Sequence, residues 1–209
     1  MTHNYSRTEL IFNAIENLLL EEGRESLTYA KISERCYLHT NTITYYFNGK
    51  EDMMIQFFQY IVDRDNANMP EFFTRVPAGL TPVEAFNELI DYIVEGGHLV
   101  SKTRRLLNLY LLPYVDISDA VKKLLSSVHN ASSASEYAAI QMYNALGIIE
   151  ESRIRESFAD LTLASSGYSL IQLFGVKCID HRLALHHTKE RLRRSFLKDE
   201  YYREREYRE

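Results

Sequence analysis

The sequence has few of the residues that mark loop-rich, secreted or metal-binding proteins. Its 209 residues include 8 Gly and 4 Pro, too few for the many turns of a β-sandwich. It has 2 Cys, Cys36 and Cys178, which are too far apart in the chain for a close-spaced metal or redox motif. We expect reduced, packed thiols of a cytoplasmic protein.

A net positive charge is absent, and long apolar runs are scarce. The formal net charge is -5, so the chain as a whole is no polyanion binder, and any nucleic-acid contact requires a local patch. Residues 1–9 are polar and predict no secretory signal. The longest low-charge run, residues 157–176, carries Asp160, Gln172 and several hydroxyls, which predicts a buried helix and no membrane partner.

What the sequence does contain is helical periodicity, with no clear strand and no internal repeat. Hydrophobic residues make up 45%, enough for a core. A first helix begins with the capping box of Ser6 and Glu9 and ends before Gly23. Further helices are expected at residues 81–95, 101–113, from 116 or 118 to 146, 152–177 and 180–197. Together with the three helices described next, the sequence predicts an all-α protein of about nine helices.

Residues 28–50 predict two short helices followed by the start of a longer one. Thr28 can cap a helix that ends near Cys36. His39 or Thr40 caps the next helix, whose apolar pair is Ile43 and Phe47. Asn48-Gly49 ends that helix, and Lys50 begins another.

Two short helices behind a supporting helix form a helix-turn-helix, in which the second helix reads base edges in the major groove. Base edges require hydrogen-bond donors and acceptors, which Thr40, Asn41, Thr42, Thr44, Tyr45 and Tyr46 supply. Lys50 is expected to hold a phosphate, although on an arbitrary helix it would be solvated surface. Tyr45 or Tyr46 could instead belong to the core. The charge balance argues mildly against DNA, because residues 1–60 hold five basic and eight acidic residues.

These residues carry a resemblance. Residues 7–62, through "IFNAIENLLLEEG" and "LTYAKISERCYLHTNTITYYFNGKEDM", resemble the DNA-binding domain of tetracycline-repressor (TetR) family transcription regulators. The positions that match are Ile11, Ala14, Gly23, Thr28, Ile32, Thr42, Phe47, Lys50, Glu51 and Met53. The resemblance implies that Thr28, His39 and the polar residues named above contact DNA. It also implies a helical C-terminal domain that binds a ligand and dimerises.

Four positions depart from the family pattern. Tyr37 stands in the turn where the family usually has a small residue, often Gly. His39 stands where Ser or Thr is usual, and Tyr46 where His is common. Thr44 replaces a tyrosine that commonly touches phosphate, and Tyr45 is the candidate to take over that contact.

The expected domains follow from the helices and from a polar, proline-containing stretch after Arg64. Residues 1–50 form the helix-turn-helix domain, 51–75 a connecting helix and linker, 76–198 the ligand-binding and dimerisation domain, and 199–209 a charged tail. In the family, the last two long helices pair with their copies in a second subunit. Residues 157–176, rich in small side chains, fit that role.

A ligand pocket is expected where tyrosine hydroxyls converge on apolar surface, although most aromatic side chains are ordinary core. By family position the candidates are Tyr92, Leu107, Tyr110, Tyr114, Tyr143 and Tyr168, and the effector is expected to be apolar or aromatic. His181, His186 and His187 lack zinc-ligand spacing, and no catalytic motif occurs. We therefore expect no metal, no cofactor and no enzymatic activity.

The sequence thus predicts a cytoplasmic, homodimeric regulator, most simply a ligand-responsive repressor of a palindromic operator in double-stranded DNA. One alternative is an activator, or a regulator that responds to a protein. The other is a helical small-molecule-binding protein or enzyme that has lost DNA binding.

Overall fold

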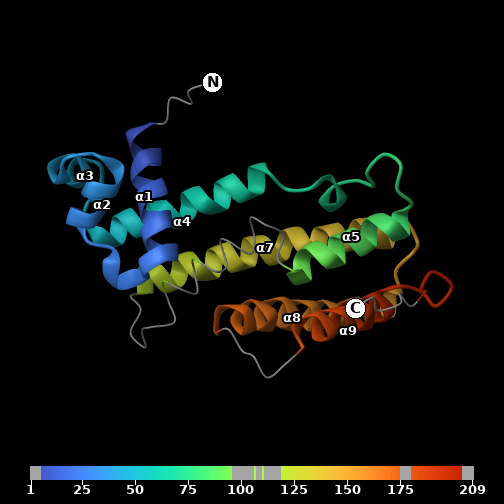
Figure 1. The fold of residues 1–209 in the computed structure, drawn as a ribbon. Helices are drawn as coiled ribbons and strands as arrows, with labels where there is room; N and C mark the ends of the chain where they lie inside the picture. The colour runs from blue at the N-terminus through green and yellow to red at the C-terminus, as the bar shows by residue number, and fades with distance from the viewer. Residues whose placement is uncertain (1–5, 96–105, 107–109, 111–118, 175–179, 204–209) are drawn as a thin grey trace. The chain divides into compact units, whose positions relative to one another are not determined.

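The computed structural model describes residues 6–95, 106, 110, 119–174 and 180–203 (Figure 1). These residues form eight α-helices and three 3₁₀ turns, without a named strand. One isolated antiparallel bridge joins Ile149 to Leu197. The predicted all-α fold class is confirmed. The predicted helix at 101–113 lies mostly outside the described residues.

The chain divides into two compact units. The first contains Met1–Ala67 and Thr103–Val128, and the second contains Asn68–Lys102 and His129–Glu209. Helix α7, Asp119–Ala145, therefore contributes its first residues to one unit and the rest to the other.

The first unit begins with the predicted helices. Their bounds are α1 Arg7–Glu22, α2 Tyr29–Cys36, α3 Thr40–Tyr46 and α4 Lys50–Ala67, with a 3₁₀ turn at Arg24–Ser26. The capping box is present, since the Glu9 N–H donates to Ser6 Oγ at 3.2 Å and the Ser6 N–H to Glu9 Oε2 at 2.7 Å. Local cap chemistry therefore sets where α1 begins.

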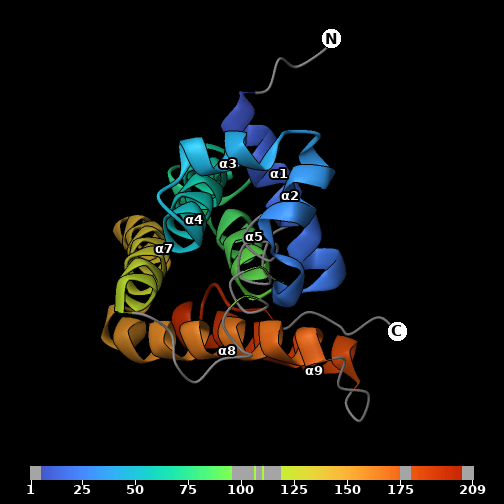
Figure 2. The same cartoon turned by 90° about the vertical axis from the view of Figure 1, so that its left-hand side faces the viewer.

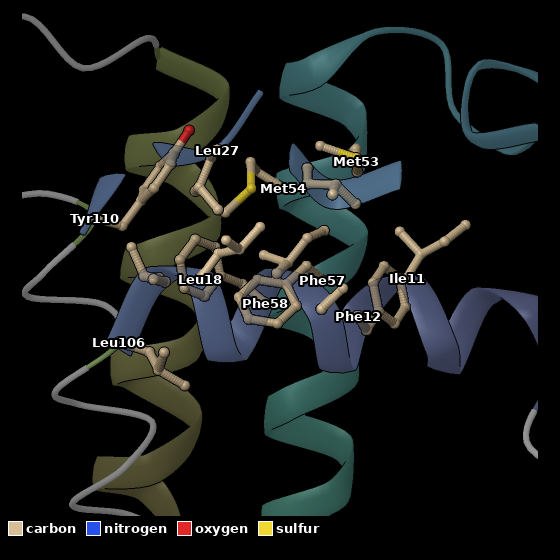
Figure 3. Packing of buried hydrophobic residues seen from close by; sticks show 14 of the residues in the cluster. Ile11, Phe12, Leu18, Leu27, Met53, Met54, Phe57, Phe58, Leu106 and Tyr110 are labelled. Carbon is tan, nitrogen blue, oxygen red and sulfur yellow. The ribbon is translucent and has the colours of Figure 1, made fainter. Parts of the chain in front are cut away.

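The core of this unit is an apolar cluster between α1 and α4. Figure 3 shows Phe12 and Leu18 of α1 beside Phe57 and Phe58 of α4, all of them buried. Leu106 and Tyr110 belong to the same cluster, although they come from the middle of the chain. Ring contacts join Phe12 to Phe57, with centroids 5.9 Å apart.

The second unit is built on three packed helices, which are α5 Pro82–Glu95, α8 Ile154–Phe174 and α9 His181–Phe196. Helices α8 and α9 lie side by side in Figures 1 and 2. A second cluster of buried apolar residues forms the core of this unit, and in it the ring of Phe86 on α5 lies 5.3 Å from that of Tyr143 and 5.7 Å from that of Phe196.

Two helix starts in this unit rest on side-chain caps. Thr81 and Glu84 form the expected reciprocal pair before α5, and the Leu183 N–H donates to Asp180 Oδ1 at 3.0 Å before α9. The predicted start at Ser152 is displaced, because a 3₁₀ turn occupies Glu151–Arg153 and α8 begins at Ile154. No helix within the described ranges combines the length and apolar content needed to cross a membrane.

Candidate nucleic-acid interface

Helix α2 is placed by a cap and by two buried side chains. The Lys31 N–H donates to Thr28 Oγ1 at 3.2 Å, so Thr28 is the N-cap residue, as predicted, while remaining exposed. Ile32 and Cys36 turn inward. Cys36 is a free thiol, and burial raises its pKa.

The turn between α2 and α3 contains an unusual residue. Tyr37 has φ 56° and ψ 35°, the left-handed conformation that normally favours glycine. The Leu38 N–H donates to Ser33 O at 3.1 Å, the six-residue bond of a Schellman cap. The Tyr37 side chain is 95% exposed, so no packing offsets the backbone cost.

Replacing Tyr37 by glycine is expected to stabilise the protein. Relief of the left-handed conformation contributes about 1–2 kcal/mol, and the added freedom of the unfolded chain removes about 0.4–1 kcal/mol of this. The midpoint of thermal unfolding should rise by about 2–4 °C for each kcal/mol of net gain in a chain of this size. Tyr37→Ala keeps the Cβ and removes the ring, and should leave the midpoint near its original value. A lower midpoint for the glycine variant would contradict the strain argument.

Helix α3 is held by one apolar row and presents polar side chains on its other faces. Ile43 is fully buried and Phe47, which caps the helix C-terminus, is 3% exposed. His39, Thr40, Asn41 and Thr44 are exposed, and Thr42 is half-buried. His39 is the N-cap residue, but its side chain makes no capping hydrogen bond.

Both tyrosines of α3 lie outside the core. Tyr45 is 83% exposed and Tyr46 is 38% exposed, and their rings meet edge to face with centroids 5.5 Å apart. Tyr46 also leans on Phe47, with a centroid distance of 6.5 Å. The sequence left open whether Tyr45 or Tyr46 belongs to the core, and the structure shows that both side chains are exposed. Contact of either ring with DNA stays a prediction.

The cations of α2 are engaged by the acidic end of α1. Arg35 Nη1 lies 2.7 Å from Glu21 Oε2 and its Nη2 lies 3.2 Å from Glu22 Oε1, while Lys31 also pairs with Glu22. The hydrogen bond that Lys31 donates to Glu22 lowers the pKa of Glu22, and the hydrogen bond that Arg35 donates to Glu21 raises the pKa of Arg35. These exposed pairs contribute little to stability but neutralise two positive charges beside α3.

Lys50 is the first residue of α4 and is exposed. Asp52 of α4 stabilises the connection that precedes Lys50, because its Oδ2 accepts a hydrogen bond from the Asn48 N–H at 2.8 Å. Hydrogen bonds from Gln56 and from the Asn48 main chain lower the pKa of Asp52. The short connection from α3 to α4 is thereby held in place, with Lys50 on its outer side.

The expected ligand residues fall into separate groups. In the second unit, the Tyr143 hydroxyl donates to the Phe72 carbonyl at 3.0 Å, and Tyr92 packs edge to face on Phe72 at 5.5 Å. Tyr143 is fully buried, and burial raises its pKa to about 12. Tyr168 is half-buried on α8. Leu107 and Tyr114 lie outside the described residues.

Tyr110 belongs instead to the first unit. The Arg24 guanidinium lies 4.4 Å from the centre of its ring, and Arg24 Nη1 donates to its carbonyl at 2.9 Å. Its ring also meets Phe58 edge to face, with centroids 5.3 Å apart, and burial raises the pKa of the phenol. Nothing in the local sequence around Arg24 or Tyr110 signals this contact.

The histidines of α9 form no metal site among the described residues. The rings of His186 and His187 stand edge to face with centroids 5.6 Å apart. Within the same residues, no group of three or more His, Cys, Asp or Glu side chains is arranged to hold a metal ion.

Comparison with known proteins identifies the fold. No family model and no curated protein matches the sequence. Among solved structures, a putative TetR-family regulator from Rhodococcus sp. has a TM-score of 0.66 and 17% identity over 90% of this chain and 98% of its own. A putative regulator from Saccharomonospora viridis in complex with choline has a TM-score of 0.70 and 15% identity over 91% of this chain and 97% of its own.

NalD from Pseudomonas aeruginosa, the secondary repressor of a multidrug efflux pump, has a TM-score of 0.58 and 15% identity over 92% of this chain and 96% of its own. The chain therefore has the fold of the TetR-family transcriptional regulators. The predicted resemblance to this family is confirmed for the fold of the chain as a whole.

Proposed function

We propose that the protein is a cytoplasmic, homodimeric transcriptional regulator that binds a palindromic operator through α3 and releases it when an effector binds. One observation carries the proposal. The exposed faces of α3 are polar, hydrogen-bonding and uncharged, whereas Ile43 and Phe47 hold the helix against the core. A braced helix with such side chains suits the major groove, where base edges present donors and acceptors.

Exposed apolar residues support dimerisation through α8 and α9. Leu163 on α8 is 71% exposed and Leu183 on α9 is 36% exposed. Such residues gain from burial against a second copy. Two-fold symmetry then presents two α3 helices to half-sites about 34–36 Å apart.

The second unit is proposed to bind the effector. Tyr92 and Tyr143, grouped around Phe72, are the described candidates, and Tyr168 is a further one on α8. Of the remaining candidates by family position, Tyr110 packs in the first unit, and Leu107 and Tyr114 lie outside the described residues. The choline complex of the Saccharomonospora viridis protein and the repressor role of NalD support ligand response and repression as the working hypothesis. An effector shifts operator affinity only if it favours one conformation.

Operator binding provides the direct test. The full chain is titrated against DNA from upstream of its own gene, with random DNA as reference, and fluorescence anisotropy reports binding. Thr42→Ala should reduce the preference for operator by about 1 kcal/mol or more if Thr42 contacts a base. Lys50→Ala should weaken binding to all sequences alike, because a phosphate contact carries no sequence information. Lys123→Ala, an exposed cation on α7, is the matched control and should change neither.

The same assay across salt concentrations counts phosphate contacts. Lys31 and Arg35 are engaged by Glu21 and Glu22, so we expect a shallow dependence on salt. Each phosphate contact contributes about 0.9 to the slope of log affinity against log salt. A slope equivalent to about ten or more contacts per dimer would contradict this expectation.

The two alternatives give different outcomes. An activator and a protein-responsive regulator both bind the operator. An activator is recognised by the position of the operator relative to the promoter. A protein-responsive regulator is recognised because a protein, rather than a small molecule, changes its affinity for the operator. A protein that has lost DNA binding shows no preference for any sequence. The absence of an effect from both small apolar molecules and partner proteins would remove the effector part of the proposal.

A further inference from the structure

We propose that α3 reads A·T base pairs, with adenine edges and thymine methyl groups as its main ligands. The inference rests on the proposed function and goes one step further, to the chemistry of the half-site. Two observations support it. The exposed side chains of α3 are uncharged, and the cations of the neighbouring helix α2 are paired with carboxylates of α1.

Guanine lacks its usual partner on this helix. The commonest specific contact to guanine is Arg or Lys bonded to O6 and N7. Helix α3, Thr40–Tyr46, contains neither residue type. The two cations of α2, Lys31 and Arg35, are engaged by carboxylates of α1. Lys50 lies beyond α3, at the start of α4.

Adenine has a fitting partner in Asn41. A carboxamide carries one acceptor and two donors, which match N6 and N7 of adenine in the major groove. Asn41 is exposed, and no hydrogen bond within the described residues occupies its side-chain amide. Its main-chain carbonyl accepts the hydrogen bond from Thr44 Oγ1.

Thymine is matched by the groups beside Asn41. Thr44 Oγ1 donates to the Asn41 carbonyl at 3.2 Å, so its proton is directed to the helix and its methyl group remains available on an exposed residue. Thr40 and Thr44 form one row along the helix, and Asn41 and Tyr45 form the adjacent row. The exposed threonine methyls and the Tyr45 ring provide apolar surface for the C5-methyl of thymine.

The test uses the full chain and chemically altered DNA. A duplex selected from a randomised library is compared with two copies, one carrying uracil for thymine and one carrying 7-deazaadenine for adenine at the contacted positions. Uracil removes only the methyl group, and binding should weaken about fourfold per contacted thymine. The 7-deaza base removes N7, and binding should weaken about fivefold or more.

Two variants assign these effects to single side chains. Thr44→Ser keeps the hydroxyl and removes the methyl, so it should no longer distinguish thymine from uracil at its position. Asn41→Ala should lose its sensitivity to 7-deazaadenine. Thr74→Ser is the matched control, because Thr74 is exposed and its hydroxyl also donates three residues back, to Glu71 O at 3.3 Å, outside the helix-turn-helix. The control should retain both sensitivities.

The possible outcomes distinguish failure of this inference from failure of the proposed function on which it rests. Specific binding that requires G·C pairs at the positions contacted by α3 overturns the inference and leaves DNA binding intact. Equal affinity for the parent duplex and both altered duplexes also overturns it. Absence of any sequence-specific binding overturns both the inference and the proposed function.

Discussion

Phe47→Ala is expected to lower the free energy of unfolding by about 3–5 kcal/mol, the usual cost of truncating a buried phenylalanine. Phe47 is 3% exposed, and its ring lies 5.8 Å from that of Phe12 on α1. Its removal leaves a cavity at the point where α3 ends and the chain turns toward α4. Because Phe47 and Ile43 are the residues that hold α3 to the core, specific DNA binding should be lost together with stability.

Urea unfolding followed by circular dichroism measures this change, at one fixed protein concentration because dimerisation adds to apparent stability. Tyr45→Ala is the matched control on the same helix. Its ring is 83% exposed, so its removal should change the unfolding free energy by no more than about 0.5 kcal/mol. A loss below about 1 kcal/mol for Phe47→Ala would contradict the role assigned to it.

Arg193→Met is expected to destabilise the second unit by about 3–5 kcal/mol, because removing one partner of a buried ion pair leaves the opposite charge behind. The Arg193 side chain is 4% exposed and pairs with Glu190, 6% exposed, and with Asp91 of α5. Lys189 lies 3.4 Å from Asp91 and also pairs with Glu95. The cluster joins α9 to α5, and Arg193 and Glu190 are its buried members, whereas the Glu95 side chain is 51% exposed.

Arg191→Met on the same helix is the matched control. Arg191 is exposed and should change the unfolding free energy by no more than about 0.5 kcal/mol. The double variant Glu190→Gln, Arg193→Met should recover part of the loss, since it removes a carboxylate together with its cation. Chemical unfolding of the three variants at one protein concentration tests the assignment. Equal stability of Arg193→Met and Arg191→Met would show that the buried pair contributes nothing.

Helix positions in this protein are encoded locally. The capping box of Ser6 and Glu9, the caps at Thr28 and Asp180, and the reciprocal pair of Thr81 and Glu84 each join residues within four positions of one another. A cap and a 3.6-residue apolar period act over one or two helical turns, so the residues that interact are close together in the sequence and can be predicted from it. The sequence does not predict the three 3₁₀ turns, because short turns carry no such period.

Local sequence patterns predict the candidate DNA surface only in part. Ile43 and Phe47 share one row of α3, so their burial followed from periodicity. The exposure of both Tyr45 and Tyr46 did not follow, since both aromatic side chains also suit a core. The pairing of Lys31 and Arg35 with carboxylates of α1 could not be predicted either, because the pattern of charges on one helix does not reveal which other helix packs beside it.

The sequence by itself determined the all-α class, most helix bounds and the polar character of α3, because these depend on neighbours a few residues away. Tertiary structure alone decided which distant side chains meet. Arg193 bonds to Asp91 across 102 positions, and Arg24 bonds to Tyr110 across 86. It also placed Tyr37 in the left-handed conformation, where the path from α2 to α3 overrides the preference of the residue. Such contacts depend on how helices pack, which no local pattern records.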